Sequence, residues 1–266
     1  MEFDTPTPFV ATTATVTAGQ VRAYAAATLQ AEFGTGGGVP PLFAVGALAG
    51  PALEELRARH LGRPGPTLVH AEQTVRLGAA PRIGESVEIR ARIGALVDVG
   101  PAPALVLEVW IADTVGHATV LMPDLPRVHR AVTRPPRPEI GAALGDFEIG
   151  LPAELAARYA DATGDRNPIH LDPAVARAAG LPGVVLHGMA TYAIVWAAAR
   201  RILADAGVDG EFVGSRTRFA LPVLPGAALA VTVHRTGDPA LVAVTARQHG
   251  RRVLRDTYLT LDRPIG

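Results

Sequence analysis

Alternation between apolar and polar positions predicts β-strands in both halves of the chain. In the first half, apolar residues occupy every second position from Val87 to Ile93 and from Leu105 to Ile111. In the second half, the same spacing or a short apolar run covers residues 229–233, 241–246 and 253–261. A period of two is typical of strands with one buried face, so we expect antiparallel sheet in each half.

Short helices are predicted between these strands. They cover residues 21–29, 153–163 and 173–179. The last one has Pro173 in its first turn and Gly180 just after its end, which are the residue types that commonly begin and end a helix. Asp172, directly before this helix, is expected to be its N-cap.

One long apolar segment, residues 188–206, predicts the central helix of the second half. Its side chains leave almost no polar face, so the helix should be buried and a curved sheet should wrap around it. The first half has a corresponding segment near Phe43–His60, although Pro51 and a polar end interrupt its apolar character.

The same order of elements occurs twice, which suggests a duplication. Residues 24–30 resemble residues 159–165, and residues 81–84 precede an alternating strand much as residues 223–226 do. We therefore expect an α+β protein of two similar units, each an antiparallel sheet wrapped around a long central helix.

Proline and arginine dominate the segment between the halves. Prolines occupy positions 123, 126, 135, 136 and 138, and arginines occupy positions 127, 130, 134 and 137. Proline at this density blocks a helix and removes strand hydrogen-bond donors, so the segment is interpreted as a linker. The expected domains are 1–125 and 140–266, with the linker at 126–139. Its arginines could bind phosphate, but a solvated linker is favoured.

Composition narrows the range of functions. The 266 residues are 48% hydrophobic and include no cysteine, so disulfides, thiolate nucleophiles and cysteine-based metal sites are excluded. Basic and acidic residues balance at 25 each, which does not favour a nucleic-acid partner. The acidic N-terminus is unlike a signal peptide, and the apolar run 190–199 is shorter than the roughly 20 residues of a membrane helix. The expectation is a soluble cytoplasmic protein.

Candidate chemistry lies in the turn that follows the helix at 153–163. Asp165, Asn167 and His170 fall within six residues of one another, and Pro168 restricts the backbone between them. The carboxylate and the imidazole can therefore converge on one small volume, as a general acid–base pair requires.

A second feature is the start of the long helix at His187 and Gly188. The first N–H groups of a helix have no internal partners and carry the positive end of the helix dipole. An acid–base pair beside such a helix end suits enolate chemistry at a thioester. His187 itself is interpreted mainly as a brace for the turn.

The segment Tyr159–Ala178, followed by His187-Gly188-Met189, resembles the hydratase motif of the MaoC-like family of (R)-specific enoyl-CoA hydratases and 3-hydroxyacyl-thioester dehydratases. The resemblance implies a double hot-dog fold. It also implies that Asp165 and His170 activate a water, that Asn167 supports them, and that a backbone N–H at Gly188 binds the thioester oxygen.

The first half departs from the motif, since Gln30 stands where Asp165 would align. By the same resemblance, this half is a degenerate hot-dog unit that accommodates the acyl chain. We expect one site per chain, at an apolar seam between the halves.

The predicted function is reversible hydration of trans-2-enoyl-CoA to (R)-3-hydroxyacyl-CoA. Alternatives are a dehydratase acting on acyl carrier protein or a polyketide intermediate, and a non-catalytic thioester-binding subunit. A hot-dog thioesterase is disfavoured because it would not need the motif. No cofactor and no metal is predicted beyond the thioester's own carrier, no membrane or nucleic acid is expected as a partner, and a homodimer is left open.

Overall fold

The computed structural model describes residues 6–34, 38–61, 69–122, 125 and 127–265. The strands are β1 (Val10–Thr15), β2 (Val69–Arg76), β3 (Ser86–Val99), β4 (Ala102–Ile111), β5 (Thr114–Leu121), β6 (Ile140–Gly150), β7 (Phe212–Phe219), β8 (Ala228–Thr236), β9 (Leu241–Gln248), β10 (Arg251–Arg252) and β11 (Leu254–Leu261). The helices are α1 (Ala18–Ala27), α2 (Gly50–His60), α3 (Leu155–Thr163), α4 (Pro173–Ala178) and α5 (Gly188–Asp205), with short turns η1 (Gln30–Phe33), η2 (Ala44–Leu48) and η3 (Pro168–His170).

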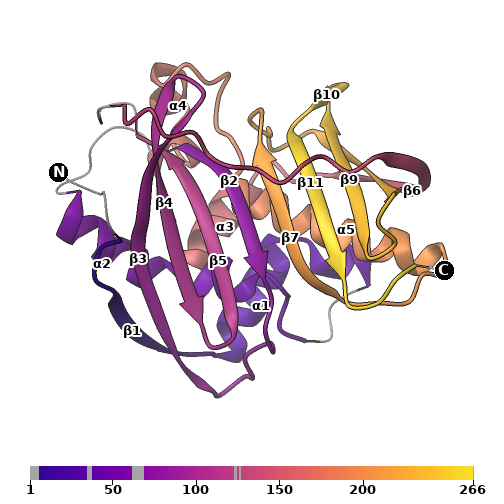
Figure 1. The fold of residues 1–266 in the computed structure, drawn as a ribbon, viewed down its shortest axis with the longest axis horizontal. Helices are drawn as coiled ribbons and strands as arrows, with labels where there is room; N and C mark the ends of the chain where they lie inside the picture. Colours follow the sequence, from indigo (N-terminus) through magenta and orange to yellow (C-terminus); the bar gives the residue numbers. More distant parts are fainter. Residues whose placement is uncertain (1–5, 35–37, 62–68, 123–124, 126, 266) are drawn as a thin grey trace.

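The strands form one sheet in which the two halves have the same strand arrangement: β1-β3-β4-β5-β2, read from one edge to the centre, corresponds to β6-β8-β9-β11-β7, read from the other edge. The order is β1-β3-β4-β5-β2-β7-β11-β9-β8-β6, and β10 adds to β9. Each half contributes an edge strand, three strands in hairpin succession and one strand at the centre, where β2 pairs antiparallel with β7 (Figure 1). This symmetry confirms the predicted duplication and the double hot-dog, α+β architecture.

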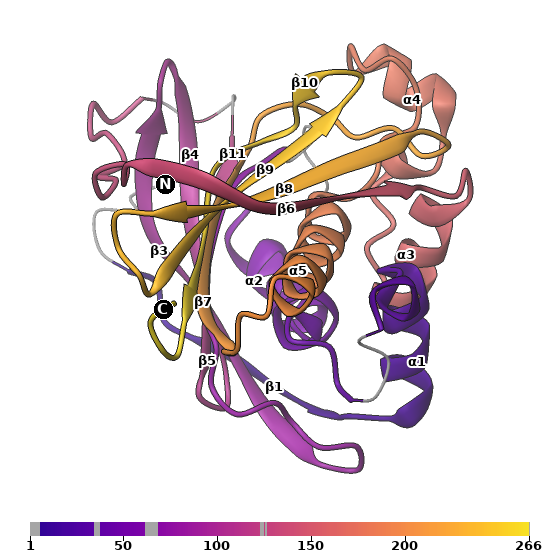
Figure 2. The ribbon, with the colours of Figure 1, turned by 90° about the vertical axis from the view of Figure 1, so that its right-hand side faces the viewer.

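Each half of the sheet curves around its own helix (Figure 2). In the second half every residue of α5 from Ala190 to Ala199 is buried, as its unbroken apolar sequence predicts. In the first half the helix is interrupted: the wide turn η2 ends at Leu48, and α2 starts afresh at Gly50. Pro51 causes this break because its ring nitrogen has no hydrogen to donate to the preceding turn.

The seam between the halves is a hydrogen-bonded ladder, and its side chains are largely polar. On the inner face β2 contributes Gln73 and Val75, and β7 contributes Ser215 and Thr217, all of them buried. The hydroxyls of Thr217 and Thr257 are hydrogen-bonded at 2.7 Å. The expectation of an apolar seam is therefore wrong for the sheet, because the backbone ladder itself joins the two halves.

Apolar contact between the halves comes instead from the helix layer. Helices α1 and α3 lie side by side (Figure 2). Their tyrosines at equivalent positions, Tyr24 and Tyr159, have ring centroids 5.9 Å apart. Each hydroxyl donates to a carbonyl of the first half, Tyr24 to Leu42 at 3.2 Å and Tyr159 to Gly46 at 3.3 Å.

The segment between the halves crosses the outer face of the sheet (Figure 1). Its Pro123 and Pro126 lie outside the described residues. Arg134 pairs with Glu72 of β2, with its Nε 3.0 Å from one carboxylate oxygen, and Arg137 pairs with Asp256 of β11 at 2.6 Å. The linker arginines are thus attached to both halves rather than simply solvated. None of the described helices is long and apolar enough to cross a membrane.

Candidate active site

The turn after α3 fixes the position of Asp165. Helix α3 ends at Gly164, whose φ of +79° lies in the left-handed region that favours glycine. The Thr163 hydroxyl accepts from the Asp165 backbone N–H at 3.3 Å, and one Asp165 carboxylate oxygen accepts from the Asn167 N–H at 3.2 Å. The carboxylate is exposed, so it faces incoming solvent or ligand.

Asn167 and Ile169 shape the second part of the turn. The Asn167 side-chain oxygen accepts from the Ile169 N–H at 3.4 Å and caps η3, while the Ile169 side chain is buried and anchors the turn. The predicted role of Asn167 as a supporting hydrogen-bond partner thus takes the form of a cap. Asp172 caps α4 through the Ala174 and Val175 N–H groups, which confirms that prediction.

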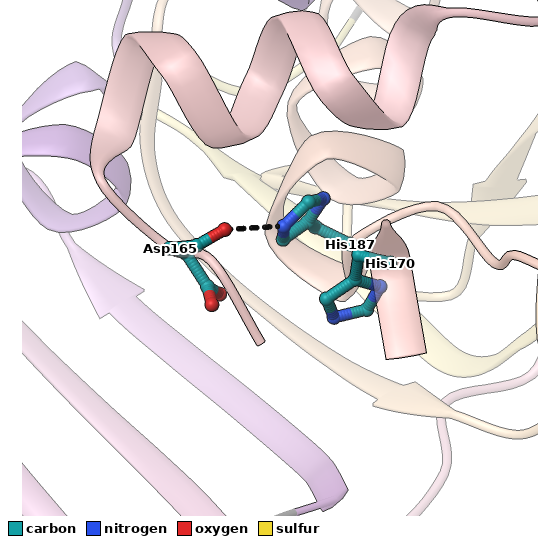
Figure 3. A group of neighbouring side chains, drawn as sticks. All are labelled: Asp165, His170 and His187. Atoms are coloured by element: carbon teal, nitrogen blue, oxygen red, sulfur yellow. Dashed lines mark hydrogen bonds between the residues drawn. The ribbon is translucent and has the colours of Figure 1, made fainter. Parts of the chain in front are cut away.

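His170 and His187 lie face to face behind the Asp165 turn (Figure 3). Their ring centroids are 3.8 Å apart in a stacked arrangement. A carbonyl oxygen can only accept, so His170 must donate through Nδ1–H to Val185 at 2.8 Å, and His187 through Nε2–H to the Asp165 carbonyl at 2.9 Å. The remaining nitrogens, Nε2 of His170 and Nδ1 of His187, then carry lone pairs.

These contacts agree with a bracing role for His187. It holds the Asp165 backbone, stacks on His170, and lies against Tyr159 with 4.8 Å between ring centroids. Its Nδ1 is buried without a hydrogen-bond partner. A buried acceptor of this kind is costly unless something in the site satisfies it.

The electrostatics keep both rings neutral near pH 7. Burial lowers the pKa of His170 below its usual value of 6.5, against the opposing effects of the Val185 carbonyl and the Asp165 charge. Burial, aided by repulsion from His170, lowers the pKa of His187 to about 4. Two uncharged rings beside an exposed carboxylate form an acid–base group suited to neutral pH.

A metal ion could also use these groups. Asp165, His170 and His187 each offer a ligand atom, and these atoms lie within 4.8 Å of one another. The absence of a metal therefore stays a prediction.

Gly188 is the first residue of α5, with His187 as its N-cap. A Cβ added at Gly188 would lie 3.2 Å from the Phe219 ring, so the neighbouring aromatic side chain leaves little room for a larger residue. A glycine at this position also lets a ligand oxygen approach the backbone N–H, because no Cβ stands in the way. The structure adds a packing reason, which sequence alone did not reveal.

In the equivalent turn of the first half, a buried glutamine, Gln30, takes the place of the Asp165 carboxylate. Gln30 is 4% exposed, and its amide nitrogen lies 3.1 Å from the Thr28 hydroxyl. Beside it lies a cavity of about 290 Å³, lined on one side by Tyr24, Val39 and Leu42 and on the other by Trp196 of α5. This cavity belongs to both halves.

One residue of the first half that we did not single out lies beside the site. The ring of His70, on β2, is 4.7 Å from that of Phe219, the residue that contacts Gly188. Sequence analysis did not predict strand β2, so no pattern in the sequence indicated a role for this histidine.

Comparison with known proteins matches the second half to a described family. A family profile described as "MaoC like domain" matches residues 129–252. 3-Hydroxyacyl-thioester dehydratase Y of Mycobacterium tuberculosis is 37% identical over 107 residues, which are 39% of this chain and 36% of that protein. Enoyl-CoA hydratase ChsH3 of the same organism is 40% identical over 86 residues, which are 31% of this chain and 29% of that protein. The chain thus matches about a third of the length of these relatives.

Solved structures resemble the whole chain. A MaoC-like dehydratase from Phytophthora capsici superposes with a TM-score of 0.78 at 20% identity, covering 96% of this chain and 95% of that one. A Mycobacterium tuberculosis protein described as having a double hotdog fold superposes with a TM-score of 0.56 at 16% identity, covering 96% and 94%. At these identities, the likeness concerns the fold.

Proposed function

We propose that the protein is a hydro-lyase that reversibly hydrates trans-2-enoyl thioesters to (R)-3-hydroxyacyl thioesters. The match of residues 129–252 to the MaoC-like domain profile supports this. The observation that carries the proposal is the turn in which Asp165 and His170 lie beside the N-terminus of α5. The names of the relatives, a thioester dehydratase and an enoyl-CoA hydratase, support it.

In the hydration direction, Asp165 and His170 hold one water between the carboxylate and the free Nε2 of the ring. The water loses a proton to this pair as its oxygen bonds to C-3 of the enoyl group. The electrons of the double bond move toward the carbonyl, giving an enolate, and C-2 then takes a proton from the pair. Dehydration is the reverse. General acid–base groups of this kind contribute about 10²–10⁴-fold to a rate.

The enolate oxygen needs hydrogen-bond donors, and Gly188 supplies one. Its backbone N–H is at the first turn of α5, where it has no partner within the helix. The helix dipole adds a favourable field for the developing negative charge. A donor of this type is worth about 2.7–4 kcal/mol in the transition state. Asn167 and His187 keep the turn in shape.

The acyl chain lies toward residues 1–125 in this proposal. The cavity beside Gln30 supports it, since α5 of the second half and the loop before η2 of the first half both line it. The domains are then a degenerate unit at 1–125, a linker at 126–139 and a catalytic unit at 140–266. The enzyme works in the cytoplasm without added cofactor or metal, on thioesters of coenzyme A. A dehydratase acting on acyl carrier protein is the alternative, because the name of one relative specifies only a thioester.

The direct test is hydration of crotonyl-CoA and of a long-chain enoyl-CoA by the purified protein, with the loss of enoyl absorbance as the readout. We expect turnover of both that survives dialysis against a chelator. The product should give no NADH with an (S)-specific 3-hydroxyacyl-CoA dehydrogenase. Absence of hydration with both substrates, or strong NADH formation, would contradict the proposal.

A further inference from the structure

A bulge in β2 turns one histidine of the first half toward the site. Against β5, His70 pairs with Val120 but Glu72 already pairs with Thr119, so Ala71 is an extra residue in the ladder. A bulge reverses the side-chain alternation of the strand that follows it. His70 and Gln73 consequently share one face of β2.

That face is the inner one. Residues paired directly across an antiparallel ladder point to the same side, and Val120 lies on the same side of β5 as Gly116. A Cβ at Gly116 would lie 3.1 Å from the Val45 side chain in the helix layer. His70 therefore points inward, toward the layer that contains the N-terminus of α5. Without the bulge it would point outward.

His70 lies at the rim of the site and is next to its central elements. Its ring packs on Phe219 with centroids 4.7 Å apart, and Phe219 in turn covers the space beside Gly188. The side chain is half-buried, while the preceding Val69 is 47% exposed. A carrier arm that leaves a thioester at Gly188 across the Phe219 ring would pass His70.

The hydrogen bond of His70 to the backbone fixes its tautomer, and the side chain of Gln73 also interacts with the ring. Nε2 is 3.0 Å from the Glu72 carbonyl oxygen, which can only accept, so Nε2 carries the proton and Nδ1 a lone pair. Burial lowers the pKa of His70 to about 4, although the hydrogen bonds to the Glu72 carbonyl and the Gln73 side chain and the charge of Asp165 oppose this, so the ring is uncharged near pH 7. A neutral acceptor at this position suits an N–H donor rather than a phosphate.

We propose that His70 is the contribution of the first half to substrate binding, with Nδ1 accepting a hydrogen bond from an amide N–H of the pantetheine arm that carries the acyl group. The inference rests on the proposed function for the choice of ligand. Coenzyme A and acyl carrier protein share this arm, so the recognition is the same for both. The site is thereby assembled from both halves, even though only one holds the acid–base pair.

Two variants of His70 test its hydrogen-bond acceptor and its aromatic ring separately. His70→Phe keeps the stacking on Phe219 but removes the acceptor, whereas His70→Asn loses the ring but places an oxygen where Nδ1 was. For crotonyl-CoA we expect His70→Phe to raise KM about fivefold with kcat nearly unchanged, the effect of one lost hydrogen bond, and His70→Asn to restore most of the loss. S-ethyl thiocrotonate, which has no amide, should be hydrated equally by wild type and His70→Phe.

His117→Ala is the matched control. This half-buried histidine belongs to the neighbouring strand β5, and its ring contacts Trp110 and the Thr74 hydroxyl rather than the site. It should leave KM for crotonyl-CoA unchanged. A His70→Phe enzyme with wild-type KM, or one impaired equally on both thioesters, would overturn the proposal, as would a His70→Asn enzyme no better than His70→Phe.

A binding measurement distinguishes failure of this inference from failure of the proposed function. Butyryl-CoA has no double bond to hydrate, and its Kd should rise about fivefold in His70→Phe and much less in His70→Asn. If wild type binds butyryl-CoA with this dependence but does not hydrate crotonyl-CoA, the role of His70 stands and the hydratase proposal fails. If wild type does not bind butyryl-CoA, the role of His70 is overturned.

Discussion

The two halves of the chain share one architecture but differ in the turn that follows the first helix. In the first half, α1 leads into η1, and the buried Gln30 bonds to its own loop. In the second half, α3 leads into an open turn that presents the Asp165 carboxylate and is braced by His187. A fold therefore determines where a site can form, and a few loop residues determine whether it carries chemistry.

Removing the acid–base pair should have the largest effect. Asp165→Asn and His170→Ala should each lower kcat for crotonyl-CoA at least about a hundredfold, since each removes a group that exchanges a proton with the substrate. Asp161→Asn changes an exposed carboxylate of α3, the helix that precedes the Asp165 turn, which pairs with Arg166, and this variant should stay near wild type. Circular dichroism checks that the fold is kept. Near wild-type turnover by Asp165→Asn would mean that the Asp165 carboxylate is not what distinguishes the catalytic half from the half with Gln30.

Replacing the brace should have a smaller effect. His187→Ala should lower kcat about tenfold, because the Asp165 backbone loses its hydrogen bond and His170 loses its stacking partner. His187→Gln can still donate from its side-chain nitrogen to the Asp165 carbonyl and should recover part of the loss. If His187→Gln and His187→Ala are as impaired as His170→Ala, His187 is itself an acid–base group rather than a brace.

Acid should destabilise the protein through its buried histidines. Burial holds the pKa values of His70 and His187 at about 4 and that of His170 below 6.5, while the unfolded chain titrates near 6.5. Below pH 6.5 the unfolded state binds more protons, so the free energy of unfolding should fall from pH 6.5 toward pH 4. Urea unfolding at several pH values measures this. His70→Phe should show a shallower fall, and an unchanged slope would contradict the assignment.

Filling the cavity of the first half should change chain-length preference rather than chemistry. Val39 lines the cavity beside Gln30, and Val39→Trp adds volume there. We expect kcat/KM for a long-chain enoyl-CoA to fall severalfold while that for crotonyl-CoA stays the same, since a short chain would not reach the cavity. Val213→Trp, at an exposed position of β7, is the control. Equal losses on both substrates would show that the acyl chain lies elsewhere.

Detaching the linker should have the smallest effect. Arg137 is 70% exposed, so its ion pair is screened by water, and Arg137→Ala should change the free energy of unfolding very little and leave kcat unchanged. Arg134→Ala should lower the free energy of unfolding more, because Arg134 is 36% exposed and its ion pair with Glu72 is less screened, whereas Glu72 and Asp256 are similarly buried and both keep a pairing with Arg218. Denaturant unfolding compares the two variants. The reverse ranking would mean that the linker is held mainly on the second half.

The sequence predicted the elements with strong patterns and the turn that carries the chemistry. The apolar run of α5, the cap at Asp172 and the alternation in β3 and β4 are local signals, and all three appear as expected. Strand β6 was not predicted, because Gly141, Gly145 and neighbouring alanines have little strand preference. Only its pairing with β8 makes it a strand.

The features that depend on contacts distant in sequence could not be predicted. A bulge is a mismatch between two strands, so the sequence of β2 alone does not show that His70 faces inward. The linker arginines pair with Glu72 and Asp256, which lie on strands of different halves. The seam was expected to be apolar because burial was considered without the backbone ladder that joins β2 to β7.

The ladder between β2 and β7 also bears on the order in which the molecule folds. The hairpins within each half join neighbours along the chain, whereas Glu72 pairs with Arg218, more than half the chain away. Contacts at such separation form late because closing a long loop costs entropy first. Until then each half exposes a strand edge, and an apolar edge would invite pairing with other chains. The polar and charged side chains of β2 and β7 disfavour such pairing until the two halves meet.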